Sequence, residues 1–212
     1  VLAHEYGHHV QDLTGALDET GGSGATGPGS ASVQTELQAD CLAGVWAPEN
    51  TREAIYDALR RKETFATSGT QMRLRAFGGW SLPANMQRRA NWVSQAYRLG
   101  VPMGSDLTVP SGRSGAPSFL FEAAKDPEGA NLDRVQVVEL WLDGTTYREK
   151  IFDVAWSSER RRDPRTGQLP AVRNTVDLGT ATYSNAIGAA LLKGQWRDPE
   201  FDATKPAVYY IR

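Results

Sequence analysis

The chain has 212 residues, with 23 lysines and arginines against 25 aspartates and glutamates, so its formal net charge is −2. That balance gives no reason to expect nucleic acid as a partner, and 40% hydrophobic with 23% charged residues is ordinary for a globular protein. No apolar run approaches the roughly 20 residues of a membrane-spanning helix, so we expect no membrane segment. The single cysteine, Cys41, excludes a disulfide within the chain.

Three helices are predicted in the first third of the chain. Apolar residues recur at helical spacing over residues 1–13, and a loop rich in glycine and serine follows at 19–32. The same spacing predicts a second helix from residue 30 or 32 to 46. Thr51 is a good N-cap for a third, amphipathic helix that runs to about residue 63.

From residue 64 onward the sequence predicts strands, and the first two of them alternate apolar and polar side chains. These strands cover residues 64–69, 72–77, 117–124, 134–144, 146–156 and 206–212. Residues 85–100 are predicted as a helix that ends at Gly100, and Asp143-Gly144 indicates a hairpin turn. We therefore expect an α+β fold, in which a helical segment precedes a mixed region of helices and strands with antiparallel hairpins.

All three histidines lie within the first nine residues, and two of them belong to an H-E-x-x-H pattern. On a helix, His4 and His8 share one face, so both imidazoles can reach one zinc ion. Glu5 lies about 100° further round, where its carboxylate can act as general base on water activated by the metal. His9 points away from His4, and we interpret it as a packing or surface residue.

The third zinc ligand is expected to be a carboxylate, because no histidine follows residue 9. The second predicted helix contains the stretch ELQAD, which supplies Glu36 as a ligand. Asp40 lies one turn later and can accept a hydrogen bond from a ligand imidazole. Cys41 is an alternative soft ligand, but it lies about 140° round the helix from Glu36, and we interpret it as a core residue.

The two metal motifs together resemble a known family. "VLAHEYGHHVQDLTG" followed by "ELQADCLAGVWA" resembles the bacterial neutral zinc metallopeptidases over residues 1–47. The resemblance implies a peptide or protein substrate, zinc as the cofactor and Glu5 as the catalytic carboxylate. It implies that His4, His8 and Glu36 bind the metal, and that Asp40 accepts a hydrogen bond from one of the ligand imidazoles. Members of that family continue with a helical segment that contains a further histidine, which this chain lacks.

The rest of the chain is similar to a different bacterial group. "LAGVWAPENTREAIYDALRRKETFATSG", "KDPEGANLDRVQVVELWLDG" and "NTVDLGTATYSNAIGAALLKGQWRDPEFD" resemble the domain-of-unknown-function family 3604 over residues 42–212. This family is related to the PHP (polymerase and histidinol phosphatase) metallohydrolases, whose metal clusters need imidazoles and carboxylates. Residues 48–212 contain no histidine, so this part is expected to be catalytically inert.

We therefore expect two partial domains, at 1–47 and 48–212, and a chain that is a chimera or a fragment joined near residues 42–47. The predicted function is zinc-dependent hydrolysis of peptide bonds, and the alternative is an inert piece of a PHP-related hydrolase. Four acidic residues could contribute to a metal site whose other ligands are absent from this chain. The simpler interpretation is that these residues lie in loops exposed to solvent. They are Asp106, Asp133, Asp177 and Glu200. The sequence does not determine the cellular location of the protein, and the bacterial cell envelope is one alternative.

Overall fold

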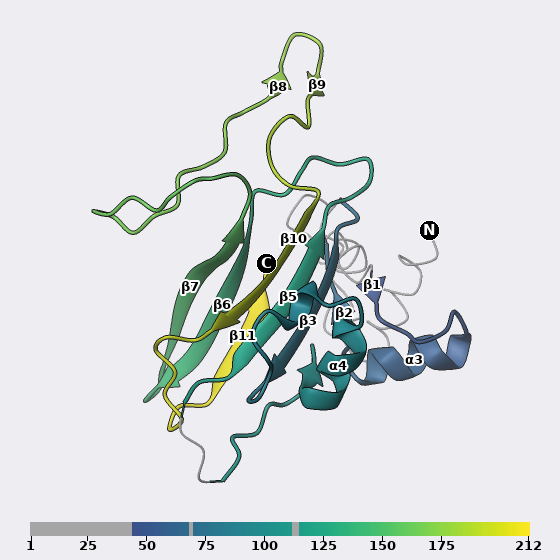
Figure 1. Ribbon diagram of the computed structural model, residues 1–212, viewed down its shortest axis with the longest axis vertical. Coiled ribbons are helices and arrows are strands. Elements are labelled where there is room, and N and C mark those ends of the chain that lie inside the picture. The colour runs from purple at the N-terminus through teal and green to yellow at the C-terminus, as the bar shows by residue number, and fades with distance from the viewer. Residues whose placement is uncertain (1–43, 68–69, 112–114) are drawn as a thin grey trace, which may run out of the picture. The chain divides into compact units, whose positions relative to one another are not determined.

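The structure is a computed structural model that describes residues 44–67, 70–111 and 115–212 (Figure 1). It contains two compact units, which divide between Arg73 and Leu74. The predicted helices at 1–13 and 30–46 lie outside the described residues, and the predicted domain boundary after residue 47 stays a prediction.

The described part of the first unit contains one helix and a short strand pair. Strand β1 (Gly44–Val45) pairs antiparallel with β2 (Thr64–Phe65), and α3 (Arg52–Arg60) lies between them in sequence. The Thr51 hydroxyl accepts a hydrogen bond from the Ala54 backbone N–H at 3.3 Å. This contact is the N-cap that the sequence predicts, so the third predicted helix is confirmed.

The second unit is built from two antiparallel-paired sheets. One has the strand order β10-β5-β3-β4 and the other the order β11-β6-β7. The first sheet contains β3 (Arg73–Gly79), β4 (Val101–Pro102), β5 (Ser118–Ala124) and β10 (Leu191–Arg197). The second contains β6 (Arg134–Asp143), β7 (Thr146–Trp156) and β11 (Ala207–Ile211). A short hairpin of β8 (Val176–Asp177) and β9 (Thr182–Tyr183) extends away from both sheets (Figure 1).

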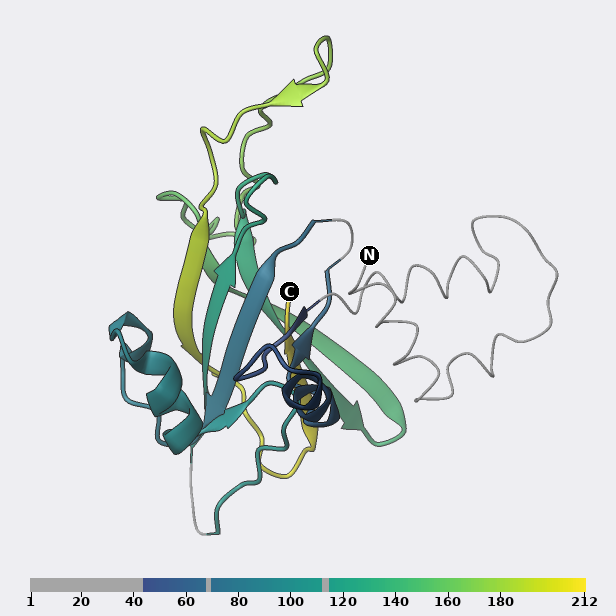
Figure 2. The ribbon, with the colours of Figure 1, turned by 90° about the vertical axis from the view of Figure 1, so that its right-hand side faces the viewer.

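Strand β5 has apolar side chains on both faces, which gives the unit three layers. On one face, Leu120 packs in a cluster with residues from β3, the 3₁₀ helix η2 (Met86–Arg88) and α4 (Trp92–Leu99). On the other face, Phe121 packs against Val135 of β6 and Leu192 of β10. Helices therefore cover one face of the four-stranded sheet, and the three-stranded sheet covers the other (Figure 2).

The β6–β7 hairpin forms where the sequence predicts it. Asp143 pairs with Thr146, and Gly144 adopts a φ of 63°, a left-handed conformation that glycine reaches without a steric penalty. The predicted strands at 117–124, 134–144, 146–156 and 206–212 are confirmed within a residue or two of their ends.

The expected α+β class is wrong for the described chain, which is mostly β. Its described residues contain two α-helices, α3 and α4, while antiparallel sheets build the second unit. The helical metal-motif segment that favoured α+β lies outside the described residues. Strand β10 was not predicted. Its alternate positions hold Leu192, Gly194 and Trp196, and the glycine in the middle hides the apolar pattern.

The predicted helix at 85–100 is divided into two pieces. Asn85 has a left-handed φ of 58°, and Arg89 is extended with ψ 145°, so the 3₁₀ turn of η2 ends before α4 begins. Asn91 then starts α4, where its side-chain carbonyl accepts a hydrogen bond from Gln95 at 2.7 Å. The sequence predicted the helix that ends at Gly100 but not the break.

We predict that Gly194→Ala destabilises the sandwich by about 1–3 kcal/mol, the usual cost of overpacking. Gly194 is the cross-strand partner of Phe121, and a Cβ at this position would lie 2.3 Å from the Phe121 ring. Because that ring is fully buried, it cannot swing away freely. Urea unfolding followed by tryptophan fluorescence measures the change.

The double variant Gly194→Ala with Phe121→Leu provides the control, because a smaller side chain opposite residue 194 leaves room for the methyl group. We expect the double-mutant cycle to show that Phe121→Leu recovers part of the lost stability. Strictly additive losses would contradict the proposed clash.

Candidate functional site

The residues predicted to bind zinc are not among those that the structure describes. His4, Glu5, His8, Glu36 and Asp40 all lie within residues 1–43, so their roles stay predictions. The described helices lack the length and apolar character that crossing a bilayer requires.

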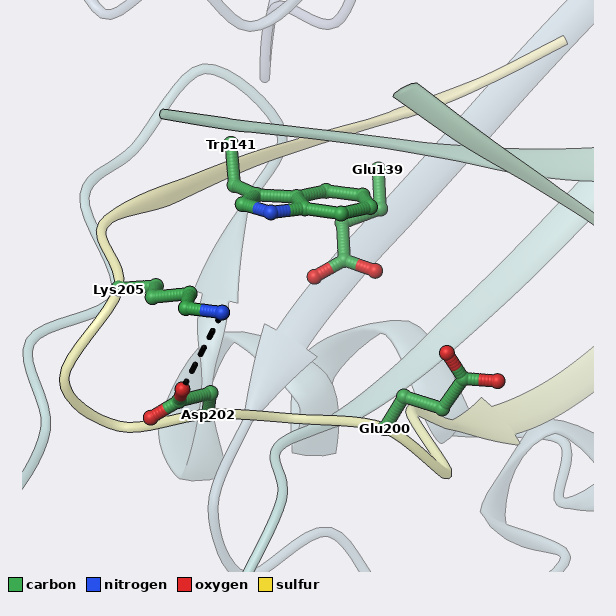
Figure 3. A pocket seen from close by; sticks show the side chains of 5 residues that line it. All are labelled: Glu139, Trp141, Glu200, Asp202 and Lys205. Carbon is green, nitrogen blue, oxygen red and sulfur yellow. Dashed lines mark ion pairs between the residues drawn. The ribbon is translucent and has the colours of Figure 1, made fainter. Parts of the chain in front are cut away.

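The described chain has a pocket of about 150 Å³ in the second unit. It is lined by one indole, three carboxylates and one ammonium group: Trp141, Glu139, Glu200, Asp202 and Lys205. Figure 3 shows the Trp141 ring lying flat over a space into which the Glu139 carboxylate and the Lys205 ammonium point. The Asp202 and Glu200 side chains come from the opposite side of this space.

Two elements place these side chains. Glu139 and Trp141 are two residues apart on β6, so they share the face of the strand that also carries the buried Val137. The loop between β10 and β11 supplies the other three. That loop is shaped by turns in which Asp198 accepts from the Glu200 N–H at 2.8 Å and Asp202 accepts from the Thr204 N–H at 2.9 Å.

A buried acidic cluster lies directly behind the pocket. The Tyr209 hydroxyl donates to Asp198 Oδ2 at 2.6 Å and lies 3.1 Å from Glu139 Oε1. Asp198 is 2% exposed and Glu139 is 8% exposed. A phenol has a single hydrogen, so it can fully satisfy only one of the two carboxylates, and the shorter distance assigns it to Asp198.

The environment of Glu139 favours its neutral form. Burial raises the pKa of the Glu139 carboxyl, and the negative charge of Asp198 raises that pKa further. A protonated Glu139 can donate a hydrogen bond to the Tyr209 oxygen, which completes the chain of contacts from Glu139 through Tyr209 to Asp198. Burial and the hydrogen bond to Asp198 raise the pKa of Tyr209 as well, so this hydroxyl keeps its proton.

The lysines near the pocket pair with its outer carboxylates. Lys150 lies directly across the strand pair from Glu139, yet its ammonium forms an ion pair with Glu200. Lys205 lies 3.7 Å from Asp202, and the side chains of both residues are almost half exposed. Hydrogen bonds from Thr204 lower the pKa of Asp202. The two inner carboxylates, Glu139 and Asp198, form no salt bridge within the described part of the chain.

The four acidic residues considered for a divided metal site do not come together. Among the described residues, no group of three or more His, Cys, Asp and Glu side chains is arranged to hold a metal ion. Asp133 pairs with Arg134 and Arg160, while Asp177 is exposed and accepts the Gly179 N–H at 2.8 Å within its own turn. Of the four, Glu200 lines the pocket.

Sequence reasoning missed Glu139, Trp141, Asp198 and Tyr209. The signal for Glu139 was present, because a single glutamate interrupts the apolar residues 137–142 of β6. Asp198 carries no comparable signal. It lies in the loop after an unpredicted strand, and only the fold brings it to Tyr209.

A family model described as "Protein of unknown function (DUF3604)" matches residues 5–212. This match confirms the second resemblance in the sequence and extends it, since we expected it to begin at about residue 42. It also runs across residues 42–47, where a join between two partial domains was expected. The metallopeptidase resemblance stays a prediction.

Several relatives match parts of the chain. Uncharacterized proteins of Mycobacterium bovis and Mycobacterium tuberculosis are each 63% identical over 49 residues, which are 22% of this chain and 16% of the relative. The uncharacterized protein YpfJ of Escherichia coli K12 is 28% identical over 116 residues, which are 48% of this chain and 40% of the relative. The chain thus spans less than half the length of each of these relatives. No solved structure matches it.

We predict that Glu139→Gln changes how stability depends on pH. Glu139 has a raised pKa in the folded chain, so above its ordinary value of about 4.3 the folded state holds more protons than the unfolded state. Wild-type stability therefore falls as pH rises through the window between the unfolded and folded pKa values. Glutamine removes this loss, and its amide N–H can donate to Tyr209 as the protonated acid does.

Urea unfolding at several pH values from 4 to 7 measures the difference between the variant and the wild type, which should grow in favour of the variant as pH rises. Asp198→Asn is the companion variant. It should flatten the wild-type dependence in part, because the charge of Asp198 is the second cause of the raised pKa of Glu139. A Glu139→Gln variant that keeps the wild-type slope would show that Glu139 does not titrate as described.

Proposed function

We propose a hydrolytic function for this chain, which belongs to DUF3604, a family of proteins of unknown function. The proposed activity is zinc-dependent hydrolysis of peptide bonds by residues 1–47. The observation that supports it is the H-E-x-x-H pattern at His4–His8, followed by Glu36 and Asp40 in the next predicted helix. The family match includes Glu5, His8, Glu36 and Asp40 and begins one residue after His4.

The donor set has the chemistry that a catalytic zinc site requires. Two imidazoles and one carboxylate are three protein ligands, and they leave a coordination position for water. Because every histidine of the chain lies at residues 4–9, an imidazole-based site can be assembled only in this part. The second unit, which we call the β-sandwich unit, is therefore proposed to support the zinc site or to bind a ligand rather than to carry out hydrolysis.

Each residue of the site has a distinct role in this proposal. Zinc, when bound, lowers the pKa of water and polarises the substrate carbonyl. Glu5 accepts the proton of the attacking water and passes it to the leaving amine. Asp40 accepts a hydrogen bond from the second nitrogen of a ligand imidazole, which fixes the tautomer and the orientation of that ring.

A second candidate is the inert module that the PHP-related resemblance implies. The length of the family match favours it, because the match covers residues 5–212 and so includes the whole described chain. On this alternative, the chain binds no zinc and the H-E-x-x-H pattern is incidental.

Metal analysis of the purified chain distinguishes the two candidates. We expect about one zinc per chain in the wild type, loss of zinc in His4→Ala and Glu36→Ala, and zinc affinity reduced about 10- to 100-fold in Asp40→Asn. His9→Ala is the matched control, since it removes an imidazole next to His8 that helix geometry predicts to point away from the site. No zinc in the wild type would favour the inert module.

Peptide cleavage tests the catalytic step separately. Glu5→Gln should retain zinc while its cleavage rate falls about 10²- to 10⁴-fold, the usual contribution of a general base. Purifying this variant in parallel also controls for contaminating proteases. Cleavage that survives the substitution would exclude Glu5 as the base, even with zinc bound.

A further inference from the structure

We propose that the pocket formed by Glu139, Trp141, Glu200, Asp202 and Lys205 is a binding site for a protonated primary amine. The ammonium group of this ligand would lie against the Trp141 ring and donate hydrogen bonds to the surrounding carboxylates. The proposal is independent of the zinc site, because it rests only on residues of the β-sandwich unit.

The first observation is that the pocket borders a buried carboxyl group that forms no salt bridge in the described chain. Glu139 and Asp198 are both more than nine-tenths buried, and they share the single proton of Tyr209. A buried carboxyl group without a cation tends to keep its proton, as Glu139 does here, and an ammonium group placed beside it would allow it to ionise. In the described chain neither carboxyl group forms a salt bridge, and Lys150, the lysine directly across from Glu139, pairs with Glu200 instead.

The second observation is that the Glu139 carboxylate opens into the pocket. Its Oε1 atom faces Tyr209, whereas the carboxylate as a whole points into the space beneath the Trp141 ring (Figure 3). The face of an indole attracts cations more strongly than any other aromatic side chain. An aromatic face above a buried carboxylate is therefore a suitable surface for an ammonium group.

Lys205 shows that this space accepts an ammonium group. Its amine points into the pocket and lies 3.7 Å from Asp202, a long ion pair between two side chains that are almost half exposed. Such a pair contributes little stability, so a ligand amine can displace it at small cost. Lys205 thus lines the pocket in the absence of a ligand, and its ammonium would compete with a ligand amine for Asp202.

The geometry favours an organic cation over a metal ion. Glu139 approaches the space from β6 and the other two lining carboxylates approach it from the opposite side, and no group of acidic side chains in the described residues is arranged to hold a metal. The pocket volume of about 150 Å³ is several times what one water molecule needs. That space suits the end of an aminoalkyl chain.

A free amine and the lysine side chain of a peptide share this chemistry, so the experiment includes both. The full chain is titrated at constant ionic strength with cadaverine and, separately, with N-acetyl-lysine methylamide. Binding is followed by the indole N–H resonance of Trp141, assigned with Trp141→Phe. The neutral control probe is the same lysine derivative acetylated on its side-chain nitrogen.

We expect saturable shifts with the charged probes and none with the neutral one. A response to both probes assigns the site to small amines and side chains alike, and a response to one identifies the source. Glu139→Gln should weaken binding at least about tenfold, and Trp141→Leu about three- to thirtyfold. Lys205→Ala should tighten it by removing the internal competitor.

Glu149→Gln is the matched control for charge. Glu149 is an exposed carboxylate next to Lys150 on β7, on the opposite face of the strand, so its loss should leave binding unchanged. Glu200→Gln alters an exposed lining residue and should weaken binding without affecting the fold. Three outcomes would overturn the proposal. They are the absence of a saturable shift with either amine, equal binding of the neutral probe, and wild-type affinity in a folded Glu139→Gln variant.

Discussion

The packing of apolar side chains on both faces of β5 is the constraint on which the second unit depends. Leu120 and Phe121 are adjacent in sequence, point to opposite faces and are both fully buried. A strand of this kind needs a cover on each side, because leaving either residue in water would forfeit about 1.5–3 kcal/mol of burial. The helical layer of η2 and α4 satisfies one face, and the β11-β6-β7 sheet satisfies the other.

The interior between the two sheets changes character along its length. Near Phe121 and Val135 it is aliphatic and aromatic, whereas towards the β10–β11 loop it becomes an aromatic cluster that ends in Tyr209. The Phe119 and Tyr209 rings lie 4.6 Å apart and join the two sheets. The hydroxyl at the far end of Tyr209 then meets the two buried carboxylates. The polar cluster is thus the end of the core, positioned by the same packing that holds the sheets together.

Two kinds of chemistry are separated along this chain. The imidazoles, which suit transition metals, are confined to residues 4–9, and the proposed hydrolysis depends on them. The β-sandwich unit instead has carboxylates and an indole around a small pocket, a combination suited to an organic cation. The DUF3604 family match includes both the histidine-containing segment and the β-sandwich unit, and it assigns an activity to neither.

The sequence by itself determined the features that depend on near neighbours. The Thr51 cap, the turn at Gly144 and the existence of strands β5, β6 and β7 each follow from the conformational preferences of a few adjacent residues. Only the tertiary structure decided the mostly β class, the division of residues 85–100 and the meeting of Glu139 with Tyr209, which lie 70 residues apart. The physical reason is that side-chain periodicity shows which face of a strand is buried, whereas the element that covers this face is chosen by non-local pairing.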